Sequence, residues 1–289
     1  MNTFTLDTPA IATSDDRPAL EEIKAPRLSA IVITKNEAHN LRECLSSLNW
    51  VQEIIVVDAE SDDATAELGR EFTDKVFVRP WQGYAPAKNF ALAQCTGDWV
   101  LWIDADERVT PELREEICEL LSKPPACEGY EIPRLANFLG KWIMHGGWYP
   151  GYVLRLFQRE GARFNERTVH EGVTLKGKIG RLQNHLLHYT DPNLEHYLEK
   201  FNRYTSLAAK ELQRQGRKFH GWDLLLRPGW FFLRMYVFKT GFLDGMAGFI
   251  LARLSAAYVF TKYAKLWEIE NCDNHDRKTD AFQAKDFKD

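Results

Sequence analysis

The strongest constraint in this 289-residue chain is the repeated alternation of short apolar runs with helical stretches. Leu28 to Thr34 is a β-branched apolar run of the kind buried in a parallel sheet, and residues 36–48 place apolar or small side chains at helical spacing. The pattern recurs, with predicted strands at 53–57, 75–78 and 99–103 and predicted helices at 64–72, 85–94 and 111–121. Four such units predict an α/β fold with a doubly wound, mainly parallel sheet.

Polar side chains follow three of the predicted strands at the points where the strands end. They are Thr34, Asn36 and Glu37 after the first strand, Asp58 after the second, and Asp104 and Asp106 after the fourth. In sheets of this kind, ligands bind outside the carboxyl ends of the strands. These side chains are therefore expected to converge on one site although they lie far apart in the sequence.

The acidic sequence WIDADE, residues 102–107, places Asp104 and Asp106 directly after a hydrophobic strand. Mg²⁺ and Mn²⁺ prefer oxygen ligands and commonly bind one or two carboxylates together with phosphate oxygens. The alternative is a solvated acidic turn that caps the helix beginning at Pro111. The position after a buried strand, level with two other polar strand ends, favours a metal site for Mg²⁺ or Mn²⁺.

The other strand-end residues suit a nucleoside, because short polar side chains can hydrogen-bond a base edge and ribose hydroxyls. Each of them could equally be a helix cap or a turn residue, and Asn36 in particular could cap its own helix. Lys88, at the start of the third helix, could face a diphosphate or could be a solvent-facing surface lysine. Both interpretations stay open.

Several functional classes are disfavoured by what the chain lacks. There is no GxGxxG after the first strand and no GxxxxGK[ST], which counts against dinucleotide oxidoreductases and phosphate-loop ATPases. The net charge of −4 argues against a nucleic-acid partner. Five widely spaced cysteines without a CxxC pair, and an acidic N-terminus without an apolar core, predict a cytoplasmic protein with reduced thiols.

A candidate catalytic base lies well beyond the strand-end motifs. Inverting glycosyl transfer needs one group to take the proton of the acceptor hydroxyl, and Glu171 in the sequence RTVHEG is our candidate. His170 could orient it or be an ordinary packed histidine. His185 and His188 have a spacing compatible with metal ligation, although such a pair is usually structural, and His188 is a weak candidate for a third metal ligand.

The regular alternation stops after about Gly129. Strands are predicted at 130–135 and 152–158 and an amphipathic helix at 194–215. Residues 222–267 mix aromatic and basic side chains, which predicts either a helical region resting on an anionic membrane or a packing or dimer interface. No run reaches the roughly 18 to 20 uncharged apolar residues of a spanning helix. The predicted organisation is a disordered tail (1–26), a catalytic domain (27–190), a helical, membrane-associated region (191–268) and a polar tail (269–289).

Together these motifs resemble family 2 glycosyltransferases of the GT-A fold, and within them the lipopolysaccharide-core glucosyltransferase branch. The resemblance rests on the sequences LSAIVITKNEAHNLRECLSSL, EIIVVDAESDDAT, PAKNFAL, GDWVLWIDADERV and VHEGV, and on HYLEKFNRYTSLAAKEL and GFLDGMAGFILARLSAAYVFTKYAKLWE nearer the C-terminus. It covers about Pro26 to Glu268. The ordered set of motifs is highly specific for the family and much less specific for donor and acceptor.

The resemblance implies a role for each candidate residue. It implies that Asp104 touches the ribose or the metal, that Asp106 binds the metal and that Glu171 is the base. It assigns the nucleoside to Thr34, Asn36, Glu37 and Asp58. The chain departs from the family pattern in having Asp58-Ala59 in place of two adjacent acids, Lys88 in place of a frequent arginine, and no QxxRW-type motif. The last departure favours addition of a single sugar.

The resulting hypothesis is an inverting, metal-dependent glycosyltransferase at the cytoplasmic face of the inner membrane. It would move one hexose, with glucose from UDP-glucose as a candidate, to a lipopolysaccharide-core or other lipid-linked glycan acceptor. Two alternatives are a nucleotidyltransferase and a non-catalytic scaffold that binds a nucleotide-sugar. The first would need a glycine-rich loop early in the chain, whereas residues 34–40 contain no glycine.

Overall fold

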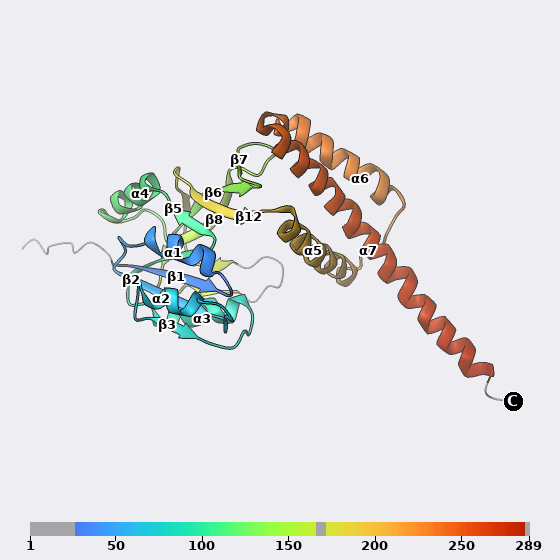
Figure 1. Ribbon diagram of the computed structural model, residues 1–289, viewed down its shortest axis with the longest axis horizontal. Helices are drawn as coiled ribbons and strands as arrows, with labels where there is room; N and C mark the ends of the chain where they lie inside the picture. Colours follow the sequence, from blue (N-terminus) through green and yellow to red (C-terminus); the bar gives the residue numbers. More distant parts are fainter. Residues whose placement is uncertain (1–26, 166–171, 287–289) are drawn as a thin grey trace, which may run out of the picture.

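The computed structural model of the protein describes residues 27–165 and 172–286. The predicted tail (residues 1–26) and the predicted base Glu171 therefore lie outside the described residues. A ten-stranded mixed sheet with helices on both faces forms the body of the protein, and a group of helices extends from one end of it (Figure 1).

The elements of the body follow one another with short connections. The first half contains β1 (Leu28–Thr34), α1 (Ala38–Ser46), β2 (Glu53–Asp58), α2 (Thr65–Arg70), β3 (Val76–Val78), α3 (Tyr84–Gln94), β4 (Trp99–Asp104), β5 (Glu107–Val109) and α4 (Pro111–Leu121). The second half contains β6 (Gly129–Phe138), β7 (Lys141–Ile143), β8 (Gly151–Gln158), β9 (Arg163–Phe164), β10 (Val173–Thr174), β11 (Ile179–Arg181) and β12 (Leu186–Asp191).

The sheet has the strand order β3-β2-β1-β4-β8-β6-β12-β5, with β7 and β11 pairing to β6 off this path. The first four strands in this order run parallel to one another. The strand β8 is antiparallel to both of its neighbours, β4 and β6. The sheet is therefore parallel where the strand–helix units were predicted and mixed beyond them.

The helices cover both faces of the sheet, because alternate strand residues point to opposite sides. On one face, Leu41 and Leu45 of α1 and Leu113 of α4 pack against the strands. On the other face, α3 packs against Ile31 of β1 and Ile55 of β2. The α/β fold class predicted from the sequence, with helices on both sides of the sheet, is confirmed.

Several strands were not predicted from the sequence, namely β5, β7, β9, β10, β11 and β12, and β5 is the one that directly follows the acidic residues. Residues 107–109 form β5, which pairs antiparallel with β12, so that Val109 lies opposite Leu186. In the sequence, Glu107 belongs to the acidic cluster that follows the predicted strand 99–103. A three-residue strand with two charged side chains has no recognisable alternation, and its partner lies far along the chain, so local pattern could not reveal it.

The C-terminal region is helical, as predicted. It consists of α5 (Leu194–Arg214), α6 (Trp222–Leu233), the π-helix η1 (Arg234–Phe238), the 3₁₀ helix η2 (Gly241–Asp244) and α7 (Gly245–Asp286). The helix α7 packs against both α5 and α6. It continues past residue 269, where the polar tail was predicted to begin.

The helical region is joined to the sheet by a separate apolar cluster. Phe138 of β6 and Ile143 of β7 are buried together with Met235 of η1 and Leu251 of α7. Within the described residues, Gly241–Asn271 is the one helical stretch that is long and apolar enough to cross a membrane, and 39 % of its most apolar window is buried within the protein. Length and hydropathy alone do not separate a membrane helix from a packed core helix.

Glu53, at the first position of β2, links the strands at the opposite edge of the sheet from the polar strand ends. Its carboxylate accepts hydrogen bonds from the Ser29 hydroxyl of β1 (2.6 Å) and the Thr96 amide before β4 (2.8 Å), and it pairs with Lys75 before β3. Burial on its own would raise the pKa of Glu53, but Lys75 and the hydrogen bonds outweigh it and lower the pKa to about 2.

We predict that Glu53→Gln lowers the free energy of unfolding at pH 7 by about 1–3 kcal/mol, the usual effect of losing hydrogen bonds to a buried charged group. Because the folded pKa of Glu53 lies below its ordinary value of 4.5, the stabilisation is full above pH 4.5. It should disappear as the pH falls to about 2. Urea unfolding across this range measures it, with the exposed Glu67→Gln as the control. Equal losses in both variants would contradict the prediction.

Candidate functional site

The predicted convergence of polar side chains is present in the backbone itself. In the parallel register, Thr34 of β1 lies directly opposite Asp58 of β2, and Asp104 of β4 lies opposite Ile33, the neighbour of Thr34. The ends of β1, β2 and β4 therefore lie side by side at one edge of the sheet. This edge is the position at which such sheets bind ligands.

The loops after β1 and β2 are tied to each other by hydrogen bonds. The Asn36 amide oxygen accepts from the Asp62 N–H (2.9 Å), and the Asn36 N–H donates to the Ser61 hydroxyl (2.8 Å). Asn36 has a left-handed backbone with φ 55°, and α1 begins after Glu37 without any side-chain cap. The interpretation of Asn36 as the cap of its own helix is therefore wrong. It holds the β2–α2 loop against the end of β1.

The other three predicted nucleoside residues differ in how fully their polar atoms are used. Asp58 is completely buried, and its carboxylate accepts from the N–H and the hydroxyl of Ser61. Glu37 accepts from the Asn40 amide (2.9 Å). Thr34 is buried, and among the described residues its hydroxyl has no hydrogen-bond partner. Thr34 is thus the residue whose polar atom is most in need of a partner, and nucleoside contacts by all four residues remain predictions.

The acidic loop after β4 is held by a fully buried arginine that the sequence reading missed. The guanidinium of Arg155, on β8, pairs through Nη2 with the carboxylates of Asp104 and Glu107 and lies 3.4 Å above the Trp102 ring. Glu107 is also fully buried and accepts from the Asp104 N–H (3.0 Å), while Arg134 approaches it at 3.5 Å. Asp104 is therefore fixed through both its side chain and its backbone.

The charges around Asp104 keep it ionised. Burial would raise the pKa of Asp104, but the positive charge of Arg155, followed by those of Lys88 and Arg134, outweighs burial and lowers the pKa to about 2. Its side chain is nevertheless 38 % exposed, so that one side of the carboxylate faces the outside of the edge. The alternative of a freely solvated acidic turn does not describe this residue.

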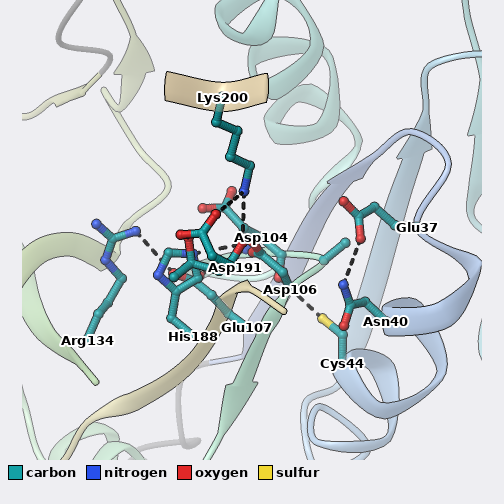
Figure 2. A network of polar contacts seen from close by, with 12 residues as sticks. Glu37, Asn40, Cys44, Asp104, Asp106, Glu107, Arg134, His188, Asp191 and Lys200 are labelled. Carbon is teal, nitrogen blue, oxygen red and sulfur yellow. Dashed lines mark hydrogen bonds and ion pairs between the residues drawn. The ribbon is translucent and has the colours of Figure 1, made fainter. Parts of the chain in front are cut away.

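Asp106 lies beside β12. Its carboxylate is 3.3 Å from His188 Nε2, and its carbonyl accepts from the Tyr189 N–H (2.8 Å). Figure 2 shows Asp106, Asp104 and His188 close together. His188, the weak candidate from the sequence, is thus brought to the acidic loop, whereas His185 contacts the Tyr149 ring instead.

The donor atoms suit a cation shared with a ligand better than one enclosed by protein. The described residues contain no group of three or more His, Cys, Asp and Glu side chains arranged to hold a metal ion. Asp104 has one carboxylate oxygen engaged by Arg155, which leaves Asp106 and the exposed side of Asp104 as oxygen donors. Two carboxylates completed by diphosphate oxygens are a common arrangement for Mg²⁺ and Mn²⁺.

Lys88 is not a surface lysine. It is buried, and its ammonium lies 4.1 Å from the centre of the Trp102 ring, which Arg155 also contacts. The next residue, Asn89, exchanges hydrogen bonds with both the N–H and the C=O of Phe164, each 2.9 Å long. The start of α3 therefore places a cation behind the acidic loop and anchors the strand that leads toward the predicted base.

The predicted base Glu171 and its neighbour His170 lie outside the described residues, but both flanks of that segment are placed. Phe164 of β9 pairs with Val173 of β10, and the Asn165 N–H donates to the Gly172 carbonyl (3.1 Å). The two described residues that flank it, Asn165 and Gly172, are therefore hydrogen-bonded neighbours, and Phe164 is tied to α3 through Asn89.

The helical region also contributes to this edge of the sheet. Lys200 of α5 donates to the Thr190 carbonyl (2.9 Å) and lies 3.7 Å from the carboxylate of Asp191, at the end of β12 (Figure 2). Asp191 is buried, and His196 of the same helix lies 3.5 Å from it. Lys200 and His196 lie in the sequence HYLEKFNRYTSLAAKEL, which carries part of the family resemblance but to which no role in the site was assigned.

Comparison with known proteins identifies the family. Residues 29–173 match glycosyl transferase family 2. A lipopolysaccharide core biosynthesis glycosyltransferase, LpsC of Rhizobium meliloti, is 35 % identical over 254 residues, which cover 83 % of this chain and 92 % of the relative. The chain belongs to glycosyltransferase family 2. The enzyme activity predicted from the sequence, glycosyl transfer, is thereby confirmed.

Other similarities extend over most of the enzyme. An uncharacterized glycosyltransferase of Rickettsia typhi is 33 % identical over 255 residues, covering 84 % of this chain and 87 % of the relative. Among solved structures, the mannosyltransferase PcManGT of Pyrobaculum calidifontis, in complex with GDP-Man and Mn²⁺, superimposes with a TM-score of 0.48 at 15 % identity. That superposition covers 85 % of this chain and 88 % of the mannosyltransferase.

We predict that Arg155→Met lowers the free energy of unfolding of the glycosyltransferase by about 3–5 kcal/mol, because the fully buried Glu107 loses its closest cation and keeps only the more distant Arg134. Urea unfolding at pH 7 measures the effect. The control is Arg181→Met, which removes an exposed ion pair with Glu131 and should cost no more than about 1 kcal/mol. A similar, small loss for both variants would mean that the buried carboxylates do not depend on Arg155.

Proposed function

We propose that the enzyme transfers a single hexose, with inversion, from a UDP-linked donor to a lipopolysaccharide-core or other lipid-linked glycan acceptor. Glucose from UDP-glucose is the first donor to test. The observation that carries the proposal is the acidic loop at the sheet edge, where Asp104 and Asp106 lie together with the cations Arg155 and Lys88 behind them. The two alternatives, a nucleotidyltransferase and a scaffold, are not retained, because the chain belongs to a family of glycosyltransferases.

The charges of the edge suit a nucleoside diphosphate. A diphosphate brings negative charge to a site that already contains Asp104 and Asp106, so the site needs compensating positive charge. Arg155 and Lys88 supply two such charges from buried positions. A divalent cation, Mg²⁺ or Mn²⁺, held by Asp106 and the exposed side of Asp104, would neutralise the charge that develops on the departing diphosphate.

A small pocket lies next to Asp58, at the end of β2. It is lined by Val57 and Ala59 at the end of β2 and by Arg79, Trp81 and Pro86 around the start of α3. These side chains are mainly apolar, with one cation, which suits stacking against a planar base. In this arrangement the base would lie beside the end of β2.

The proposed reaction is a direct displacement at the anomeric carbon. The acceptor oxygen forms a bond to that carbon while the bond to the diphosphate oxygen breaks, and the nucleoside diphosphate leaves with the electron pair. Glu171 takes the proton of the acceptor hydroxyl. The role of the remaining polar edge, from Thr34 to Asp104, is to hold the donor so that its anomeric carbon faces this base.

The proposal places the enzyme at the cytoplasmic face of the inner membrane as a peripheral protein. A nucleotide-sugar dissolves in water, whereas a lipid-linked acceptor is held in a bilayer. The enzyme must therefore meet its acceptor at a membrane surface. Its helical region is the part of the chain proposed to make that contact. This region reaches the active edge, by which we mean the edge of the sheet that carries the acidic loop, through Lys200.

We expect Asp106→Ala to abolish turnover, because it removes the carboxylate that is free of an arginine partner. The assay is release of UDP from a panel of UDP-sugars with Mn²⁺, together with a thermal shift that depends on both nucleotide-sugar and metal. The matched control is Glu160→Ala, an exposed acid on the loop after β8. Near-normal transfer by Asp106→Ala in the presence of a chelator would remove the metal from the proposal.

We expect Glu171→Gln to bind the donor normally and to lower kcat by about 10²- to 10⁴-fold, the usual contribution of a general base. Titration calorimetry with UDP and Mn²⁺ reports donor binding, and UDP release reports turnover. Glu166→Gln, in the same stretch of sequence, is the control and should retain activity. Full activity of Glu171→Gln would eliminate it as the base and leave the donor site in place.

A further inference from the structure

Exposed apolar side chains of the enzyme are concentrated on the consecutive elements α6, η1, η2 and the start of α7, residues 222–249. We call this surface the apical face. The most exposed members are Leu225 (79 %), Met246 (72 %) and Leu226 (69 %). Ring contacts between Trp230 and Phe238 (5.7 Å) join α6 to η1. A soluble monomer seldom exposes so many large apolar side chains from adjacent elements, and such a surface is typical of a site that contacts a membrane or another protein.

In the same region, the acidic side chains are buried and the basic side chains are exposed. Residues 222–260 contain two acids, Asp223 and Asp244, and both are buried. The cations of this stretch are all exposed, namely Arg227, Arg234, Lys239 and Arg253. The surface that reaches the solvent is therefore apolar and positive, although the stretch contains acids.

Each of the two buried acids is paired with other residues of the protein. Asp223 pairs with Arg227 and with Arg217, at the end of the α5–α6 connection. Asp244 accepts from the His145 N–H (2.9 Å) and from the His145 ring (2.8 Å), in the loop after β7. The acids thus hold the helices in place, and they leave no negative charge to repel an anionic partner.

We propose that the apical face lies in the interface of an anionic bilayer, with α6, η1 and η2 parallel to the membrane plane. This inference rests on the proposed function and names the partner as an anionic lipid surface rather than a second protein. Apolar side chains that enter the headgroup region, flanked by arginine and lysine, are the elements of an interfacial anchor. Each cation near such a surface strengthens its binding to anionic lipid.

The packing of α7 argues against a spanning helix, although Gly241–Asn271 is long and apolar enough. One side of α7 is committed to α5, where Lys265 Nζ donates to the Asn202 side chain (2.7 Å) and the Ser206 hydroxyl (2.8 Å). The helix α5 carries Glu199, Lys200 and other charged residues, which a spanning α7 would draw into the hydrocarbon at high cost. An in-plane position leaves these contacts intact.

The anchor also orients the active edge, because the helical region is rigidly attached to the sheet. Asp244 holds the His145 loop, and the Gly146 N–H donates to the Lys239 carbonyl (2.8 Å). From the same helical region, α5 contacts the active edge through Lys200. A membrane that binds the apical face therefore lies at a fixed height relative to the acidic loop, where a lipid-linked acceptor can be taken.

The test is sedimentation of the full-length enzyme with vesicles of phosphatidylethanolamine and phosphatidylglycerol (3:1) and with vesicles of phosphatidylcholine. We expect binding to the anionic vesicles that weakens with added salt. The double substitution Leu225→Ser and Leu226→Ser should weaken the partition by at least about tenfold, and Arg234→Gln by about fivefold. The controls are Ile179→Ser and Lys178→Gln, exposed residues of β11 and the loop before it, which should bind as the wild type does.

Three kinds of result would overturn the inference. Absence of wild-type binding, or equal binding by the apical variants, would show that the apical face does not contact lipid. Resistance of the bound enzyme to alkaline carbonate extraction would indicate a spanning helix. A wild-type dimer that the apical variants dissociate, without vesicle binding, would make the partner a second copy. UDP release without vesicles is measured in parallel. If neither the wild type nor any variant releases UDP while the wild type still binds vesicles, the proposed function is wrong and the membrane anchor stands.

Discussion

The candidate site depends on one ion network, in which the buried Arg155 pairs with both Asp104 and Glu107. Three acids within four residues, 104 to 107, repel one another, and Glu107 is fully buried. A carboxylate in such a position needs hydrogen-bonded partners, which Arg155 and the Asp104 N–H supply to Glu107. Replacement of such a network by apolar residues is often neutral for stability. We therefore infer that this network serves to hold the acidic loop in a defined geometry.

The mixed topology of the sheet is what makes this network possible. A parallel sheet alone would place only strand ends at the active edge, and Arg155 is in the interior of β8. Because β8 runs antiparallel between β4 and β6, its middle lies beside the end of β4, where Arg155 covers the Trp102 ring. Lys88 reaches the same ring from α3. Two buried cations thus contact the same indole and together counter the acids of the loop.

The sequence predicted the parallel half of the fold well, because β-branched runs, helical spacing and polar strand ends are local signals. It placed Asp104, Asp106 and Asp58 at one edge correctly, since parallel strands bring their carboxyl ends together. It could not predict β5, Arg155 or Lys200 as part of the site. Their roles depend on pairing and packing between distant segments. An arginine inside the apolar run VLRLF was the one available hint, because a charged residue in a buried strand needs a partner.

The alternatives for Asn36 and Lys88 show why single residues are harder to interpret than patterns. Asparagine before a helix is most often a cap, yet here a left-handed backbone turns its amide toward the β2–α2 loop. Lysine in the first turns of a helix is most often exposed, yet Lys88 is buried because Trp102 offers its ring face. In both cases the deciding contact comes from another strand or loop, so the three-dimensional fold sets the role.

Ion pairs and hydrogen bonds of buried acids connect the helical region to the sheet that carries the acidic loop. Asp191 closes β12 beside the acidic loop, and the cation that approaches it, Lys200, comes from α5 (Figure 2). A second carboxylate, Asp244, fixes η2 to the loop after β7. Two acids thus bind the helices to the sheet at separate points, and the contacts at both points favour one orientation of the helices toward the acidic loop.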